Sequence, residues 1–125
     1  MAITLDAQLT IHEQQALQDF VAFLHQIAPD QIVSIALFGS KSRGDSTPDS
    51  DIDVLIILNR EDRRLRREIS RQAARISLAH DVILSPRVIG AERWREMRDF
   101  SLYKNIQRES VKLDFQDDVQ IDKAA

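Results

Sequence analysis

The sequence predicts an α/β (α+β) fold in which a small mixed β-sheet is covered by helices, and three observations lead to this prediction. The expected elements follow one another as helix, strand, strand, helix, strand, helix, an order that favours a layered arrangement of sheet and helices. The run 54–58 (VLIIL) is apolar at every position and therefore belongs in the middle of a covered sheet. The helical segments carry their apolar residues at helical spacing, along one side.

The first helix is predicted over 10–28. Thr10 and Glu13 have the spacing of a capping box, and Pro29 ends the segment. The apolar stripe of this helix consists of Leu17, Phe20, Val21, Leu24 and Ile27. Two short apolar runs follow, 32–38 and 51–58, and they predict two strands joined by a turn-rich connection.

The second half of the chain predicts a further helix, a third strand and a closing helical region. Asn59 is expected to cap an arginine-rich helix over 61–79, and the run 80–86 (HDVILSP) predicts the third strand. The inner face of the helix carries Leu65, Ile69, Gln72, Ala73 and Ile76. The helical region after the strand is marked by Trp94, Met97, Leu102 and Ile106, and 110–115 (SVKLDF) predicts an edge strand. We therefore expect one domain over 1–113, the helix 10–28 included, and a loosely held C-terminal tail over 114–125.

Composition excludes several classes of protein. Hydrophobic residues make up 43% of the 125 residues and charged residues 30%, values typical of a globular domain. No cysteine is present, which excludes disulfides, thiolate zinc sites and a cysteine nucleophile. No apolar run has the length of a membrane span and the amino terminus lacks a signal-peptide pattern, so we expect a cytoplasmic protein without a membrane partner. The formal net charge of −3 disfavours nucleic acid as a general partner.

Residues that can carry chemistry concentrate in the connection between the first two strands, within 37–58 (LFGSKSRGDSTPDSDIDVLIIL). Gly39 and Ser40 follow the first strand directly, where backbone N–H groups can surround an anion, and Lys41 and Arg43 add positive charge. The loop has neither the GKS or GKT of a P-loop nor the GxGxxG of a dinucleotide fold. It therefore predicts a phosphate site of another kind.

Two carboxylates open the second strand. Asp51 and Asp53 flank Ile52, and the period of two in a strand places both carboxylates on one face. Adjacent carboxylates repel each other unless a cation lies between them, and Mg²⁺ favours such hard oxygen ligands together with substrate phosphates. Asp, Ser, Gly and Pro are also the usual turn formers, so the Asp-x-Asp pattern alone is weak. Its combination with the preceding loop is far more specific and predicts a nucleotide–metal site.

These residues together resemble the signature of the minimal nucleotidyltransferase domains in the DNA polymerase beta superfamily. In that family a strand ends in Gly-Ser, an Arg-Gly follows, and an Asp-x-Asp opens the next strand. A third acidic residue lies on a later strand, and Asp81 occupies the corresponding place here. The run 105–113 (NIQRESVKL) resembles the helix and strand that close these domains, so the resemblance covers 20–113. Lys41 is a minor departure, because relatives more often carry an arginine or an aromatic residue there.

The resemblance implies the nucleotidyltransferase fold and a Mg²⁺-dependent transfer of a nucleoside monophosphate, AMP from ATP or the equivalent from another triphosphate, to a hydroxyl group. By the same resemblance, the catalytic and metal-binding residues are Asp51, Asp53 and Asp81, which would hold two Mg²⁺ ions. The nucleotide and its phosphates would be bound by Gly39, Ser40, Lys41, Arg43 and Gly44. The sequence does not identify the base or the acceptor.

The resemblance also suggests a partner. Stand-alone domains of this size in the family are often antitoxins that silence a HEPN toxin by adding adenylate to one of its tyrosines, so a cognate HEPN-type toxin in a hetero-oligomer is the expected partner. One alternative is a binding module that neutralises a partner by contact alone. Others are an antibiotic or small-molecule adenylyltransferase, and an RNA-modifying transferase, which the negative net charge disfavours. The arginines of the helix 61–79 indicate either a solvated face or a partner surface.

Overall fold

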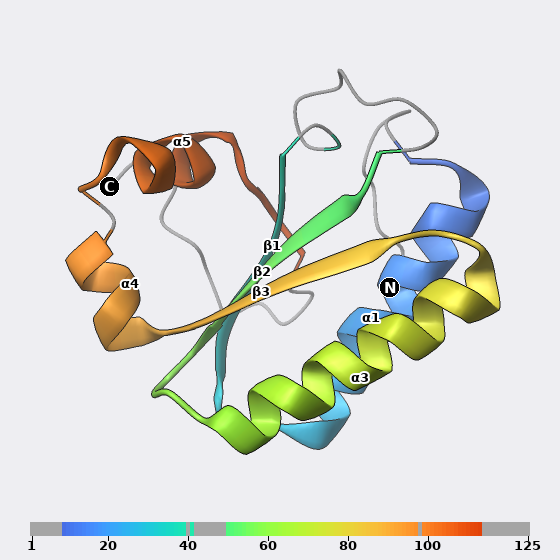
Figure 1. Cartoon of the computed structure of the whole chain (residues 1–125), viewed down its shortest axis with the longest axis horizontal. Coiled ribbons are helices and arrows are strands. Elements are labelled where there is room, and N and C mark those ends of the chain that lie inside the picture. The colour runs from blue at the N-terminus through green and yellow to red at the C-terminus, as the bar shows by residue number, and fades with distance from the viewer. Residues whose placement is uncertain (1–8, 40, 42–49, 98, 114–125) are drawn as a thin grey trace.

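The protein forms a mixed four-stranded sheet flanked by helices, in agreement with the predicted fold class (Figure 1). The computed structural model describes residues 9–39, 41, 50–97 and 99–113. Within them the strands are β1 (Ile32–Phe38), β2 (Ile52–Leu58), β3 (Leu84–Gly90) and β4 (Val111–Lys112), in the order β3-β2-β1-β4. The helices are α1 (Ile11–Ile27), α3 (Arg63–His80), α4 (Ala91–Met97) and α5 (Ser101–Glu109).

Helix α1 begins at the capping box that the sequence predicts. The Thr10 side-chain oxygen accepts a hydrogen bond from the Glu13 backbone N–H at 3.1 Å, and a Glu13 carboxylate oxygen accepts one from the Thr10 backbone N–H at 2.8 Å. Two N–H groups that a helix start leaves without an intrahelical partner are thus satisfied. The helix ends at Ile27, just before Pro29, as expected.

Strand β2 lies in the interior of the sheet, as its wholly apolar run predicts. It pairs antiparallel with β1, where Phe38 lies opposite Asp53, and parallel with β3, where Ser85 lies opposite Asp53. Strand β4 pairs antiparallel with the other side of β1 and forms one edge of the sheet, while β3 forms the opposite edge. The end of β1 and the starts of β2 and β3 therefore meet at one end of the sheet.

The predicted limits of two elements, the arginine-rich helix and the third strand, are wrong. Helix α3 is capped by Asp62, whose carboxylate accepts from the Leu65 N–H at 3.0 Å, and Asn59 instead donates to the Asp30 carbonyl. The third strand, predicted over 80–86, runs over Leu84–Gly90, because α3 continues through His80. The predicted closing helical region consists of α4 and α5, separated by a turn.

The two faces of the sheet are covered differently. Helices α1 and α3 lie side by side across one face (Figure 1), and their apolar residues pack with Ile35, Ile52 and Ile56 into the larger core. The other face packs against α4 and α5 through a smaller cluster that includes Leu55, Ile57, Trp94 and Tyr103. We refer to these as the α1–α3 face and the α4–α5 face.

Among the described helices, none combines the length and apolar character needed to cross a membrane. The predicted tail 114–125 lies outside the described residues, so the boundary at residue 113 stays a prediction. The strand predicted over 110–115 is observed as the short edge strand β4.

Candidate active site

Gly39 and the Asp51–Asp53 pair meet at the end of the sheet where β1 stops and β2 begins. Gly39 has a positive φ of 77°, a backbone conformation that residues other than glycine rarely adopt. A Cβ atom built on Gly39 would overlap the Oδ2 oxygen of Asp53, so the glycine is what allows the carboxylate to lie against the backbone. The loop predicted to bind phosphate therefore starts in contact with one of the two predicted metal ligands.

Asp53 lies on the α4–α5 side of the sheet, and Asp51 directly precedes β2. Asp53 alternates with Leu55 and Ile57, which pack in the cluster on that face, whereas Ile52 between the carboxylates is fully buried in the larger core. Asp51 is exposed and Asp53 is half-buried. Ile52 is held to the start of the third strand by a hydrogen bond from its N–H to the Ile83 carbonyl at 2.8 Å. The start of β2 thus carries two carboxylates, one just before the strand and one within it, at a rim that solvent reaches.

Lys41 is buried and its charge is matched within the protein. Its side chain is 2% exposed, and Nζ lies 2.6 Å from Oε2 of Glu13, whose side chain is 5% exposed. The other Glu13 oxygen closes the capping box of α1. The residue two positions after Gly39 is therefore tied to the first turn of α1, and Glu13 serves two partners at once.

Asp81 lies at the same end of the molecule but not on a strand. It is the C-cap of α3, exposed, with left-handed φ and ψ of 57° and 47°, and its N–H donates to the Ser77 carbonyl. Together with Thr10, Glu13 and Ser50 it lines a pocket of about 410 Å³ between the start of α1 and the end of α3. The resemblance places the third acidic residue on a strand. That placement does not hold for Asp81, because the chain reaches β3 only at Leu84.

The carboxylates at this end do not form a three-ligand cage within the described part of the chain, where no group of three His, Asp or Glu side chains is arranged to hold a metal ion. Two adjacent carboxylates nevertheless fit a cation such as Mg²⁺, which takes one or two protein carboxylates and completes its coordination with phosphate and water. Ser40, Arg43 and Gly44, also predicted to bind the nucleotide, lie outside the described residues.

Two residues of this region were not anticipated from the sequence. Ser85 is the β3 residue in register with Asp53, and the alternation of the strand would have identified it once the start of β3 was known. Glu13 was expected only as a helix-capping residue. No sequence signal identifies it as the partner of Lys41, because that contact joins segments 28 positions apart (41 − 13).

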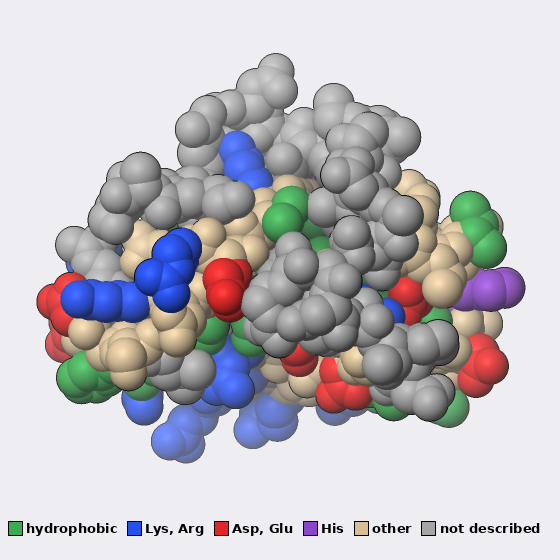
Figure 2. All heavy atoms as spheres, turned by 90° about the horizontal axis from the view of Figure 1, so that it is seen from above, with side chains coloured by type: hydrophobic (Ala, Val, Ile, Leu, Met, Phe, Trp, Pro, Cys, Tyr) green, Lys and Arg blue, Asp and Glu red, His purple; other side chains and the backbone are tan. Residues whose placement is uncertain are grey.

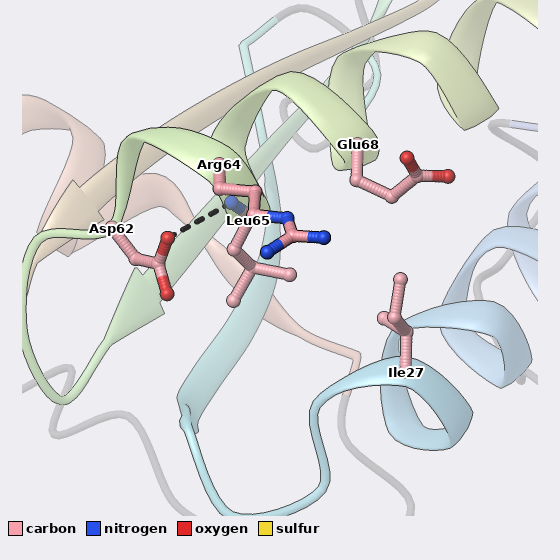
Figure 3. A pocket seen from close by; sticks show the side chains of 5 residues that line it. All are labelled: Ile27, Asp62, Arg64, Leu65 and Glu68. Carbon is pink, nitrogen blue, oxygen red and sulfur yellow. Dashed lines mark hydrogen bonds between the residues drawn. The ribbon is translucent and has the colours of Figure 1, made fainter.

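A second pocket, of about 300 Å³, lies at the junction of the end of α1 and the start of α3 (Figure 3). It is lined by Ile27, Asp62, Arg64, Leu65 and Glu68. The hydrogen bond from the Leu65 backbone N–H, and then the one from the Gln31 side chain, hold the pKa of Asp62 below its usual value. Asp62 thus acts as the cap of α3, which makes this pocket a structural junction rather than a second candidate active site.

Comparison with known proteins identifies the family of this chain. The family model of the nucleotidyltransferase domain matches residues 17–120. Two proteins of Methanocaldococcus jannaschii, MJ0141 and MJ0604, are each named as candidate protein adenylyltransferases. The first is 33% identical over 73 residues, which cover 58% of this chain and 74% of that protein. The second is 45% identical over 47 residues, which cover 38% of this chain and 47% of that protein.

Solved structures share the fold. The toxin–antitoxin complex MntA–HpeT contains a chain with a TM-score of 0.50 and 22% identity, covering 80% of this chain and 73% of that one. A toxin–antitoxin structure with AMP-PNP has a TM-score of 0.52 and 21% identity, and the match covers 80% of this chain and 74% of that one. A structure described as a minimal nucleotidyltransferase has a TM-score of 0.55 and 22% identity. The match covers 86% of this chain and 99% of that one. The family match over most of the chain, on a fold of this type and with the Asp-x-Asp beside a glycine turn, shows that this chain belongs to the nucleotidyltransferase domain family.

Proposed function

We propose that this nucleotidyltransferase transfers AMP from ATP, with the help of Mg²⁺, to a tyrosine hydroxyl of a HEPN-type toxin and acts as its antitoxin. The observation that carries the proposal is the Asp51–Asp53 pair beside the positive-φ turn at Gly39, in a chain of this family. The protein acceptor is supported by the similarity to candidate protein adenylyltransferases. The toxin partner and ATP are supported by the names of the structures that share the fold.

In the proposed reaction the acceptor oxygen attacks the α-phosphorus of ATP, the bond to pyrophosphate breaks, and the hydroxyl proton leaves to a base or to water. Mg²⁺, when bound, neutralises charge on the triphosphate and on the attacking oxygen. Asp51 and Asp53 would hold it, since they flank Ile52 at the start of β2, at an accessible rim. Gly39 lies against Asp53, so that phosphates bound next to Gly39 would lie beside this carboxylate.

The remaining predicted residues have separate proposed roles. Lys41 contributes to the nucleotide site by fixing the loop to α1 through Glu13. Ser40, Arg43 and Gly44 are proposed to contact the phosphates on the basis of the family signature alone. Asp81 is proposed to draw the acceptor proton or to assist the metal from the end of α3. Asp81 belongs to the end of α3 and not to β2. Asp81→Asn therefore tests this role separately from Asp51 and Asp53.

The deciding experiment is co-purification of the protein with the product of the adjacent gene, followed by incubation with Mg²⁺ and each nucleoside triphosphate in turn. Intact mass spectrometry of both chains is the readout. We expect one AMP-sized increase on the partner with ATP, and none with Asp51→Asn/Asp53→Asn, in which the site keeps its shape but loses its negative charge. A tight complex without any mass change would contradict transfer and would indicate neutralisation by contact.

A further inference from the structure

A third pocket, rich in arginine, lies at the β3 edge of the sheet, away from the Gly39 turn. It has a volume of about 300 Å³, and three arginines from three elements line it, Arg66 of α3, Arg87 of β3 and Arg93 of α4, together with Met97 and Tyr103. We call it the arginine pocket. Seen from above, Lys and Arg side chains gather along the lower margin of the molecule (Figure 2), the side on which β3 and α3 lie nearest the viewer in Figure 1.

The arginine pocket lies at the β3 edge, where Arg66 and Val88 approach it from the α1–α3 face and Arg87 lies on the same face of the sheet as Asp53. Arg87 lies opposite Leu55 in the parallel pairing, and Leu55 is the next residue after Asp53 on that face of β2. Two residues along a strand span about 6.6 Å and neighbouring strands lie about 4.8 Å apart, so the Cα atoms of Asp53 and Arg87 are separated by about 8 Å. A ligand that reaches Asp53 across this face therefore passes Arg87.

The charges of the pocket are only partly matched by the protein. Arg66 pairs with Glu61, and both side chains remain nearly half exposed. Arg87 and Arg93 are exposed, and the side chain of neither forms an ion pair or hydrogen bond with another residue in the described part of the chain. Elsewhere on α3, by contrast, Arg71 is matched by Glu68 at 2.9 Å. Among the described residues, these two guanidinium groups therefore have no anionic partner.

The inner wall of the pocket is rigid and partly apolar. Tyr103 is buried and meets Trp94 edge to face, with ring centroids 5.6 Å apart and an interplanar angle of 78°. Met97 packs against the same cluster. A wall of this kind, below guanidinium groups that form forked hydrogen bonds, suits a carboxylate carried on a short apolar stem.

We propose that the arginine pocket binds an acidic side chain of the protein acceptor, close in sequence to the hydroxyl that receives the nucleotide. The proposal rests on the proposed function only in assuming a protein acceptor. An extended peptide advances about 3.3 Å per residue, so a separation of about 8 Å places the glutamate or aspartate two or three residues from the modified residue. A local pocket with an apolar wall fits a peptide better than a polyanion, which the net charge of −3 repels.

The pocket is tested with fluorescein-labelled nonapeptides at low ionic strength, read by fluorescence anisotropy. One carries a central tyrosine with glutamates two and three residues away on both sides, and the control carries glutamines in those places. We expect the glutamate peptide to bind and the glutamine peptide to bind at least tenfold more weakly. Arg87→Glu/Arg93→Glu should weaken binding by a similar factor. Arg75→Glu, which changes an exposed arginine of α3 outside the pocket, should change it less than twofold.

Other outcomes separate the pocket from the transfer reaction. Asp51→Asn/Asp53→Asn should abolish transfer and leave peptide binding intact. The pocket proposal is overturned if both peptides bind alike, if Arg75→Glu weakens binding as much as the double variant does, or if a single-stranded oligonucleotide of equal charge binds to the arginines more tightly. It is also overturned if Arg87→Gln/Arg93→Gln, a milder change whose folding is checked by its melting temperature, leaves the KM for the unmodified partner unchanged. Peptide binding without any transfer would instead refute the proposed function and spare the pocket.

Discussion

The two faces of the sheet are built from neighbouring residues of the same strands but are used differently. On the α1–α3 face, two long helices bury Ile52, Val54 and Ile56 completely. On the α4–α5 face, two shorter helices cover Leu55 and Ile57, whereas Asp53, Ser85 and Arg87 are partly or fully exposed on the same side of their strands. One face therefore supplies most of the folding energy, and the other remains partly open for chemistry.

The glycine at the rim of the open face should show the largest effect on activity. Gly39→Ala forces a side chain into the Asp53 carboxylate at a positive φ, so we expect transfer to fall by about 100-fold, the loss that a misplacement of about 1 Å produces. Gly90→Ala is the matched control. Its Cβ would lie 2.9 Å from the Glu61 nitrogen at the opposite end of the sheet, so it should lower the melting temperature and retain transfer. Equal activity losses in the two variants would contradict a special role for Gly39.

The buried Lys41–Glu13 ion pair should show the largest effect on stability. Lys41→Met leaves a buried carboxylate without its counter-ion, which costs on the order of 3–5 kcal/mol in urea unfolding. Glu13→Gln/Lys41→Met removes both charges and keeps an acceptor for the capping box, so it should recover most of that loss. We expect transfer to return together with stability. A stable but inactive double variant would mean that Lys41 contacts the nucleotide directly.

Ile56 and Ile57 are consecutive residues of β2 that point to opposite faces, so their substitution compares directly how much each face contributes to stability. Ile56 belongs to the large core and is fully buried, and Ile57 belongs to the small cluster and is 5% exposed. Ile56→Ala should cost about 4 kcal/mol and Ile57→Ala about 2–3 kcal/mol, since the smaller cluster can relax around the cavity. Urea unfolding of the two variants measures the difference. Equal costs would show that α4 and α5 close their face as tightly as α1 and α3 close the other.

The acid dependence of Asp62 should give the smallest effect. The pKa of this carboxyl is lowered in the folded protein by the Leu65 N–H and the Gln31 side chain. Its ionised form therefore stabilises the fold at neutral pH, and this contribution is lost as the pH falls through the lowered pKa, below about 4. Asp62→Asn keeps a competent cap at pH 7 but removes the titration. Melting temperatures between pH 7 and 2.5 should fall less steeply in this variant, and parallel curves would contradict the assignment.

The sequence predicted the fold well where local patterns decide it. The capping box of α1, the limits of β1 and the interior position of β2 all follow from residue periodicity and were confirmed. The start of β3 was misjudged because the run 80–86 is apolar enough for either a helix end or a strand. The left-handed backbone at Asp81 decides between them, and only the structure shows it.

The candidate site was predictable in composition but not in contacts. The alternation around Ile52 correctly placed Ile52 in the core, whereas the common face of Asp51 and Asp53 stays a prediction, because Asp51 lies just before β2. The burial of Lys41 could not be predicted, because it depends on how the first turn of α1 meets the loop in three dimensions. The arginine pocket is likewise a product of packing, since its three guanidinium groups come from elements that meet only after the sheet has formed.

The double engagement of Glu13 links two segments whose order could otherwise vary independently. One oxygen holds the Thr10 N–H and the other holds Lys41, so opening of the first turn of α1 and release of Lys41 share a free-energy cost. By thermodynamic linkage, a nucleotide that favours the held form of the loop also slows that opening. Amide hydrogen exchange at Glu13 and Gln14, whose N–H groups bond to Thr10, would then report occupancy of the proposed site from the first turn of α1.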